Sequence, residues 1–102
     1  MDVQSLTELA AQCDYKAREM ARAMGITPRH LQRLFASQFG FGPQQWLNEQ
    51  RLLVAKNMLC SARAVKEVAY HLGFPSAAQL SRDFRNYFGV KPSTLLAQRD
   101  RE

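Results

Sequence analysis

The sequence predicts an all-α fold of seven helices, built as two matched units joined by one long helix. Apolar residues recur at helical spacing along the chain, and no stretch shows the convincing apolar–polar alternation of a strand. The chain also matches itself when it is shifted by 48 and then 49 residues. Glycine and proline stand where the apolar stretches end and begin, as they do at helix boundaries.

The N-terminal unit is predicted to span residues 1–42. Its first helix carries an apolar stripe, which consists of Val3, Leu6, Leu9 and Cys13. A short second helix is expected over about 15–24, with Asp14 as its N-cap. The third helix follows Gly25 and ends at Gly40. Three helices therefore precede the connecting helix.

A long linker helix is predicted over 43–60, because a proline opens it and an apolar pattern continues to its end. At 1.5 Å per residue it would extend for about 27 Å. The C-terminal unit, 61–102, is expected to hold helices over about 64–72 and 76–88, and Pro92 opens a last short one.

The two units are related by an internal repeat. "REMARAMGI" at 18–26 pairs with "KEVAYHLGF" at 66–74. "LQRLFASQFGFGPQQWL" at 31–47 pairs with "LSRDFRNYFGVKPSTLL" at 80–96. A match of this length indicates one supersecondary unit used twice.

Each unit carries the pattern of a helix-turn-helix. An alanine stands four residues before a glycine, as Ala21 and Gly25 and again as Ala69 and Gly73. Alanine lets two helices approach closely, and glycine adopts the left-handed conformation that turns the chain between them. The next helix then bears apolar residues at four-residue spacing, which are Leu31, Phe35 and Phe39, and Leu80, Phe84 and Phe88. In such a motif the second helix enters the DNA major groove.

The second helix of each unit has a defined start. Thr27 is expected to cap the first of them, with Pro28 at the first helical position. Ser76 is expected to cap the other, with Gln79 completing a capping box. A fixed N-terminus matters because this end of a recognition helix reaches base edges and phosphates.

The charge distribution favours a polyanionic partner. Fourteen Lys and Arg face nine Asp and Glu, and residues 15–99 hold thirteen of the bases against four acids. The sequence shows no signal peptide, no long apolar run, no zinc-ligand spacing and no catalytic motif. We therefore expect a cytoplasmic protein that is not an enzyme and holds no metal or cofactor. Cys13 and Cys60 are expected to be small buried residues.

The polar flank of each second helix is the candidate reading surface. It carries Arg29, Gln32 and Arg33 in the first unit, and Ala78, Gln79 and Arg82 in the second. Arg pairs with guanine and Gln with adenine, at about 1–3 kcal/mol of discrimination for each good pair. A solvated polar face is the alternative for any single amphipathic helix. The matched repeat and the basic charge favour base contact.

Phosphate contacts are expected from a second group of residues, which are Thr27, Ser76, Arg85, Asn86, Lys91, Lys16 and Arg51. Arg51 has the alternative role of buttressing the linker helix. Trp46, Phe41 and Phe74 are expected in the core instead of stacking on bases.

"HLQRLF", "RLLVAKNML", "EVAYHLGF" and "LSRDFRNYFGVKP" resemble the DNA-binding domain of the AraC/XylS family of bacterial transcription regulators, over essentially the whole chain. The resemblance implies two helix-turn-helix subdomains on a rigid linker helix, with two recognition helices in successive major grooves of an asymmetric site. By matching position, it assigns base reading to Arg29, Gln32 and Arg33, and to Ala77, Ala78, Gln79 and Arg82.

The second unit departs from the commoner family pattern. Ala77 and Ala78 are small where longer polar residues are frequent, and Asp83 adds an acid beside Arg82. An alanine can touch a thymine methyl group but cannot form a bidentate bond. We therefore expect the first helix to dominate sequence discrimination and the second to anchor the backbone.

The predicted function is sequence-specific binding of double-stranded DNA that regulates bacterial transcription, as an activator with RNA polymerase as a further partner. A protein-interaction module is the main alternative. An anionic membrane is disfavoured as partner, because the bases do not lie on one long amphipathic helix. Many family members carry an effector-binding or dimerisation domain, which 102 residues do not accommodate. A stand-alone short member and an excised domain both remain open.

Overall fold

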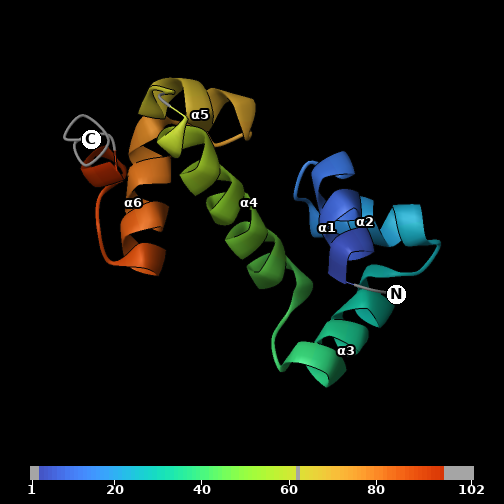
Figure 1. The fold of residues 1–102 in the computed structure, drawn as a ribbon. Coiled ribbons are helices and arrows are strands. Elements are labelled where there is room, and N and C mark those ends of the chain that lie inside the picture. The colour runs from blue at the N-terminus through green and yellow to red at the C-terminus, as the bar shows by residue number, and fades with distance from the viewer. Residues whose placement is uncertain (1–2, 62, 96–102) are drawn as a thin grey trace. The chain divides into compact units, whose positions relative to one another are not determined.

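The computed structural model describes residues 3–61 and 63–95, which form two compact units that divide between Arg51 and Leu52 (Figure 1). Every regular element among these residues is a helix. They are α1 (Val3–Gln12), α2 (Ala17–Met24), α3 (Pro28–Phe39), α4 (Pro43–Cys60), α5 (Val65–His71) and α6 (Ala77–Phe88). A last helix begins at Pro92 and is described to Leu95. The predicted all-α fold of seven helices is confirmed.

The first unit is built from α1, α2, α3 and the first half of α4. Its buried side chains are Ala10, Cys13, Tyr15, Met20, Ala21, Leu31, Phe35, Pro43, Trp46 and Leu47. The ring centroid of Phe35 lies 5.5 Å from that of Trp46, so α3 packs against the start of α4. Trp46 is therefore a core residue, as predicted from the sequence.

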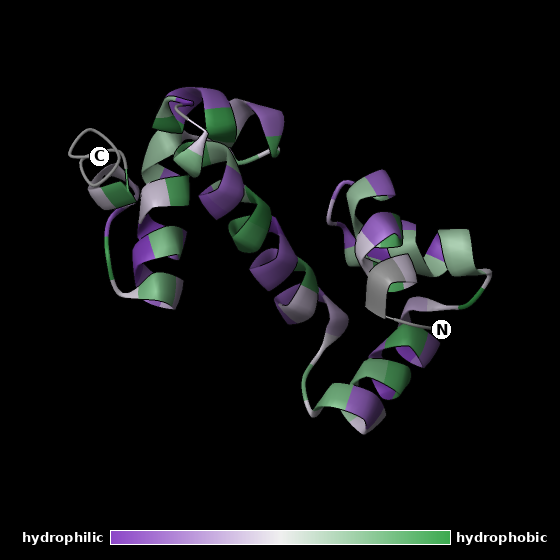
Figure 2. Ribbon diagram, viewed as in Figure 1, coloured by the Kyte–Doolittle hydropathy of each residue, from purple (hydrophilic) through white to green (hydrophobic). Residues whose placement is uncertain are grey.

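The second unit is built from the other half of α4 with α5 and α6. Its buried apolar side chains are Leu52, Ala55, Leu59, Val68, Ala69, Leu72, Phe74, Leu80, Phe84 and Pro92. The Lys56 ammonium lies 5.4 Å from the centre of the Phe88 ring, a cation–π contact between α4 and α6. Hydrophobic positions alternate with hydrophilic ones along α6, as its amphipathic pattern requires (Figure 2).

The two turns have the same geometry. Gly25 and Gly73 have φ of 72° and 76°, in the left-handed region that glycine tolerates best. The N–H of the next residue donates to an alanine carbonyl, from Ile26 to Ala21 and from Phe74 to Ala69, both at 3.0 Å. This is the six-to-one bond of a Schellman motif. The helix-turn-helix predicted from Ala-x-x-x-Gly is therefore present in both units.

The start of α2 differs from the prediction. The helix begins at Ala17, and Asp14 is not its N-cap, because Asp14 and Tyr15 both have a positive φ of 57°. Lys16 holds the cap position without a side-chain bond. The Oε1 of Gln44 instead accepts the Ala17 N–H at 3.0 Å, and its Nε2 donates to the Tyr15 carbonyl at 3.0 Å. A residue of α4 thus caps α2.

One burial expectation for the apolar residues is confirmed and two are not. Cys13 is buried, and burial raises the pKa of its thiol, with the charge of Glu19 adding to the effect. Cys60 is exposed, so the prediction that it is buried was wrong. It lies one residue, about 100° of helix rotation, beyond the buried Leu59. Phe39, the last residue of the apolar stripe predicted with Leu31 and Phe35 and thus expected to face the core, is 39% exposed, although its ring centroid lies 5.2 Å from that of Phe35.

Candidate nucleic-acid interface

The two candidate recognition helices, α3 and α6, begin in the same way. Thr27 Oγ1 accepts the His30 N–H, and Ser76 Oγ accepts the Gln79 N–H, each at 3.1 Å. Each cap therefore satisfies one of the N–H groups that a helix start leaves unpaired. Both helices have 12 residues. The predicted caps are confirmed.

The capping box predicted for α6 is only half formed. Among the described residues, the Gln79 oxygen does not accept the Ser76 N–H, and the Gln79 Nε2 donates to Asp83 Oδ1 at 2.9 Å. Asp83 lies one helical turn further on, where its carboxylate accepts the amide N–H as an i,i+4 partner. The side chain of Gln79 is thereby held along α6.

On α3, the predicted readers are exposed. Leu31 and Phe35 are buried, which turns the opposite side of the helix to solvent. Arg29, Gln32 and Arg33 all lie on that side. The first half of α3 thus exposes two guanidinium groups and one side-chain amide to solvent.

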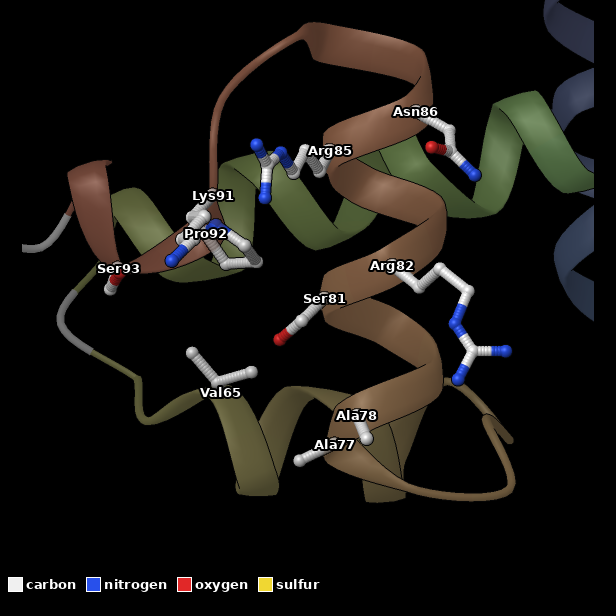
Figure 3. Close-up of a pocket in the computed structure, with 10 residues that line it drawn as sticks. All are labelled: Val65, Ala77, Ala78, Ser81, Arg82, Arg85, Asn86, Lys91, Pro92 and Ser93. Carbon is white, nitrogen blue, oxygen red and sulfur yellow. The ribbon is translucent and has the colours of Figure 1, made fainter.

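On α6, the predicted readers are shorter and more enclosed. Ala78 and Arg82 are exposed, whereas Ala77 and Gln79 are half-buried. Figure 3 shows Arg82 extended away from the helix, on the opposite side from Ser81. Arg82 is therefore the one long side chain that α6 projects freely from this set.

A surface hollow of about 680 Å³ lies beside α6 (Figure 3). It brings together three predicted phosphate ligands, Arg85, Asn86 and Lys91, with the predicted readers Ala77, Ala78 and Arg82. Val65, Ser81, Pro92 and Ser93 complete its lining. Three cations around a partly apolar hollow suit a sugar–phosphate strand, which is anionic outside and apolar at the sugar.

Sequence reasoning did not single out Ser81, which the structure places beside the predicted site residues. It lines the hollow and stands 49 positions after Gln32, the offset that relates the two units. Applying that offset residue by residue would have found it. Its hydroxyl can donate or accept a hydrogen bond.

Comparison with known proteins identifies the fold. Residues 20–98 match the family model described as "Helix-turn-helix domain". A crystal structure of an AraC-type regulator from Chromobacterium violaceum shares 28% identity, covers 92% of this chain and 90% of that one, and has a TM-score of 0.79. The chain belongs to the AraC-type helix-turn-helix family of DNA-binding domains.

Two curated relatives of this AraC-type domain are transcriptional regulators of longer chain. It is 36% identical over 77 residues to the HTH-type transcriptional regulator RipA of Corynebacterium glutamicum, covering 76% of this chain and 23% of that protein. It is 40% identical over 77 residues to GlxA of Rhizobium meliloti, covering 74% of this chain and 24% of that protein. The chain spans about a quarter of the length of these relatives.

Two further candidate phosphate ligands of the AraC-type domain lie in the first unit. Lys16 is exposed, with its Nζ 4.0 Å from Asp14 Oδ2. Arg51 is half-buried near Tyr15. Burial raises the pKa of the Tyr15 phenol, and the positive charge of Arg51 opposes that rise. Phosphate contact and buttressing both stay predictions for Arg51.

The AraC-type domain is a transcription factor module and not an enzyme. Within 3–61 and 63–95, no three His, Cys, Asp or Glu side chains gather where a metal ion could be held. Among the same residues, no helix combines the length and apolar character needed to cross a membrane.

Proposed function

We propose that this chain binds double-stranded DNA sequence-specifically, with α3 and α6 in successive major grooves of an asymmetric site. The observation that carries the proposal is the matched pair of capped helices. Each buries one apolar stripe and leaves an arginine at the equivalent place, Arg33 and Arg82, exposed to solvent. An exposed guanidinium near the start of such a helix suits guanine or phosphate.

The two helices take different shares of the binding. Arg29, Gln32 and Arg33 on α3 have the length and hydrogen-bonding groups for base edges. The hollow beside α6 gathers Arg85 and Lys91, which suit the DNA backbone. We assign most of the sequence discrimination to α3 and most of the backbone anchoring to α6. Thr27 and Ser76 add helix N-termini that attract phosphate.

The regulatory outcome is activation of transcription. One relative, 29% identical over 80 residues, is the virulence regulon transcriptional activator VirF of Yersinia enterocolitica, and this chain covers 30% of it. An activator needs a protein contact as well as DNA, and RNA polymerase is the proposed partner. The proposed place of action is the bacterial cytoplasm, on the nucleoid.

Selection of bound duplexes from random DNA tests the proposal. We expect an enriched asymmetric sequence, and an affinity that falls steeply with salt because each phosphate contact releases counterions. An affinity that hardly changes with salt, or no enriched sequence, would overturn it.

The double variant Arg29→Ala/Arg33→Ala separates DNA reading from protein interaction. Loss of the selected sequence with unchanged helical circular dichroism supports reading by α3. Arg63→Ala is the matched control, since this arginine lies 3.6 Å from Glu67, outside both recognition helices. A double variant that retains its site would favour the interaction module.

A further inference from the structure

The hydrogen bond between Gln79 and Asp83 orients an amide on the reading face of α6. Gln79 Nε2 lies 2.9 Å from Asp83 Oδ1, and both side chains are half-buried. A carboxylate only accepts hydrogen bonds, so the amide nitrogen must be the end that faces it. The amide oxygen therefore lies at the other end. In the part of the chain that the structure describes, it has no hydrogen-bond partner.

The backbone of the same residue is also held. The Gln79 N–H donates to Ser76 Oγ, so both ends of Gln79 are tied within the first two turns of α6. This is the end of a recognition helix that contacts base edges. An unconstrained glutamine can present either its NH₂ or its oxygen to a base, because its terminal torsion is broad and roughly two-fold. Gln79 cannot exchange the positions of its NH₂ group and its oxygen without losing the hydrogen bond to Asp83.

We infer that Asp83 is a positioning residue that fixes the Gln79 amide, so that α6 selects a base with an exocyclic amino group, adenine or cytosine, at one position of the site. The amide nitrogen uses one of its two N–H groups on Asp83, and the oxygen has no such partner, so we assign the oxygen as the acceptor for the base. In the major groove, adenine N6 and cytosine N4 are donors, whereas guanine O6 and thymine O4 are acceptors. The nearby carboxylate repels acceptors in addition.

Comparison of the two units shows that only α6 has the residues for this hydrogen bond between Gln79 and Asp83. The positions of Gln79 and Asp83 correspond to His30 and Leu34 on α3. Leu34 has no carboxylate and is 38% exposed. The inference deepens the proposed function and rests on it, since Asp83 matters here only if α6 contacts bases.

Parallel selections from random duplex DNA, with wild type, Asp83→Leu, Asp83→Glu and Gln79→Ala, test the inference. We expect wild type to enrich adenine or cytosine at one position of the half-site read by α6. Asp83→Leu copies the residue of the other unit, and it should lower that preference about fivefold or more, as should Gln79→Ala. Asp83→Glu keeps a carboxylate one turn from Gln79 and should restore most of it.

Overall affinity distinguishes positioning from a structural role. Asp83→Leu removes a negative charge, so total binding should stay equal or tighten while the base preference is lost. Glu67→Gln is the matched charge control in the same unit and should leave the preference unchanged. Thermal unfolding of each variant shows whether the fold is retained.

The double variant Gln79→Ala/Asp83→Leu shows whether Asp83 acts through Gln79. We expect it to have the base preference of Gln79→Ala alone. A further change would mean that Asp83 contacts the base directly, and an unchanged preference in Asp83→Leu would mean that it positions nothing. Either result overturns the inference while the enriched site still supports DNA binding. A wild type that selects no sequence would defeat the proposed function itself.

Discussion

The helices α3 and α6 share one scaffold but carry different side chains at equivalent places. Arg29 corresponds to Ala78, and Gln32 to Ser81, so α3 has long polar groups where α6 has short ones. Further along, Ala36 corresponds to Arg85, so the extra cation of α6 lies one turn later. The caps, the turn glycines and the buried stripes are the same in both. The two units thus share the residues that pack each helix against its unit, and they differ in the exposed side chains that could contact DNA.

The flanks of the two helices differ as well. Leu34 on α3 lines a partly apolar hollow of about 380 Å³ with Leu6 and Met24. The corresponding Asp83 on α6 instead bonds to Gln79. The reading face of α3 is therefore flanked by an apolar side chain, Leu34. The reading face of α6 is flanked by the Asp83 carboxylate, which holds the side chain of Gln79.

The largest expected effect comes from truncating the matched core leucines. Leu31 and Leu80 are both fully buried, so Leu31→Ala and Leu80→Ala should each cost about 2–5 kcal/mol of unfolding free energy. Trp46 is the single tryptophan and lies in the core of the first unit. In urea unfolding, the midpoint reported by Trp46 fluorescence should fall mainly with Leu31→Ala. The unfolding curve followed by circular dichroism should change with both variants. Equal shifts of the fluorescence midpoint would show that the units do not unfold separately.

An intermediate effect is expected from the matched arginines. Arg33→Ala should weaken binding to the selected site by about 1–3 kcal/mol and relax the base preference there. Arg82→Ala should weaken binding more evenly across sequences. Titrations against single-base-pair variants of the site measure both. Greater relaxation with Arg82→Ala would reverse the assignment of reading to α3.

The smallest expected effect is a loss of stability at alkaline pH in the first unit. The pKa of Cys13 lies above its ordinary value of 9.0, so the folded state holds this proton more tightly than the unfolded chain. Its contribution is complete below pH 9.0 and is lost as the pH rises through the folded pKa. The stability reported by Trp46 should therefore decline above that pH. The decline should be shallower in Cys13→Ala, and an identical pH profile would contradict this assignment.

Local sequence patterns predicted most of the fold. Thr27 and Ser76 act on N–H groups three residues away, and the bounds of α4 follow from a proline and an apolar pattern, so neighbouring residues suffice. The errors arose where a side chain distant in sequence, or a competing hydrogen-bond partner, determines the local structure. Gln44 caps α2 from 27 positions away, and Gln79 binds Asp83 in preference to the backbone of its own cap. Cys60 was misplaced because it was assigned to the apolar register of this helix, whereas it lies one residue beyond the buried Leu59 and is exposed.

The candidate site likewise has a part that the sequence predicted and a part that needed the structure. Exposure of Arg29, Gln32 and Arg33 follows directly from the phase of the buried stripe, so the sequence predicted it. The hollow beside α6 joins the helix to Val65 and to 91–93, and this grouping needs the tertiary fold. The role of each residue on DNA stays a prediction for the binding experiments.

The side chain of Gln44 also bears on how the first unit assembles during folding. The turn before α2 places two non-glycine residues at positive φ, a conformation that costs energy until contacts hold it. Gln44 supplies one of these contacts, beside the backbone hydrogen bonds from the Tyr15 N–H to Ala10 and from the Lys16 N–H to Cys13. A segment that ends at residue 42 lacks this contact and Trp46. We therefore expect a segment of the first unit to be fully stable only when it includes the opening turns of α4.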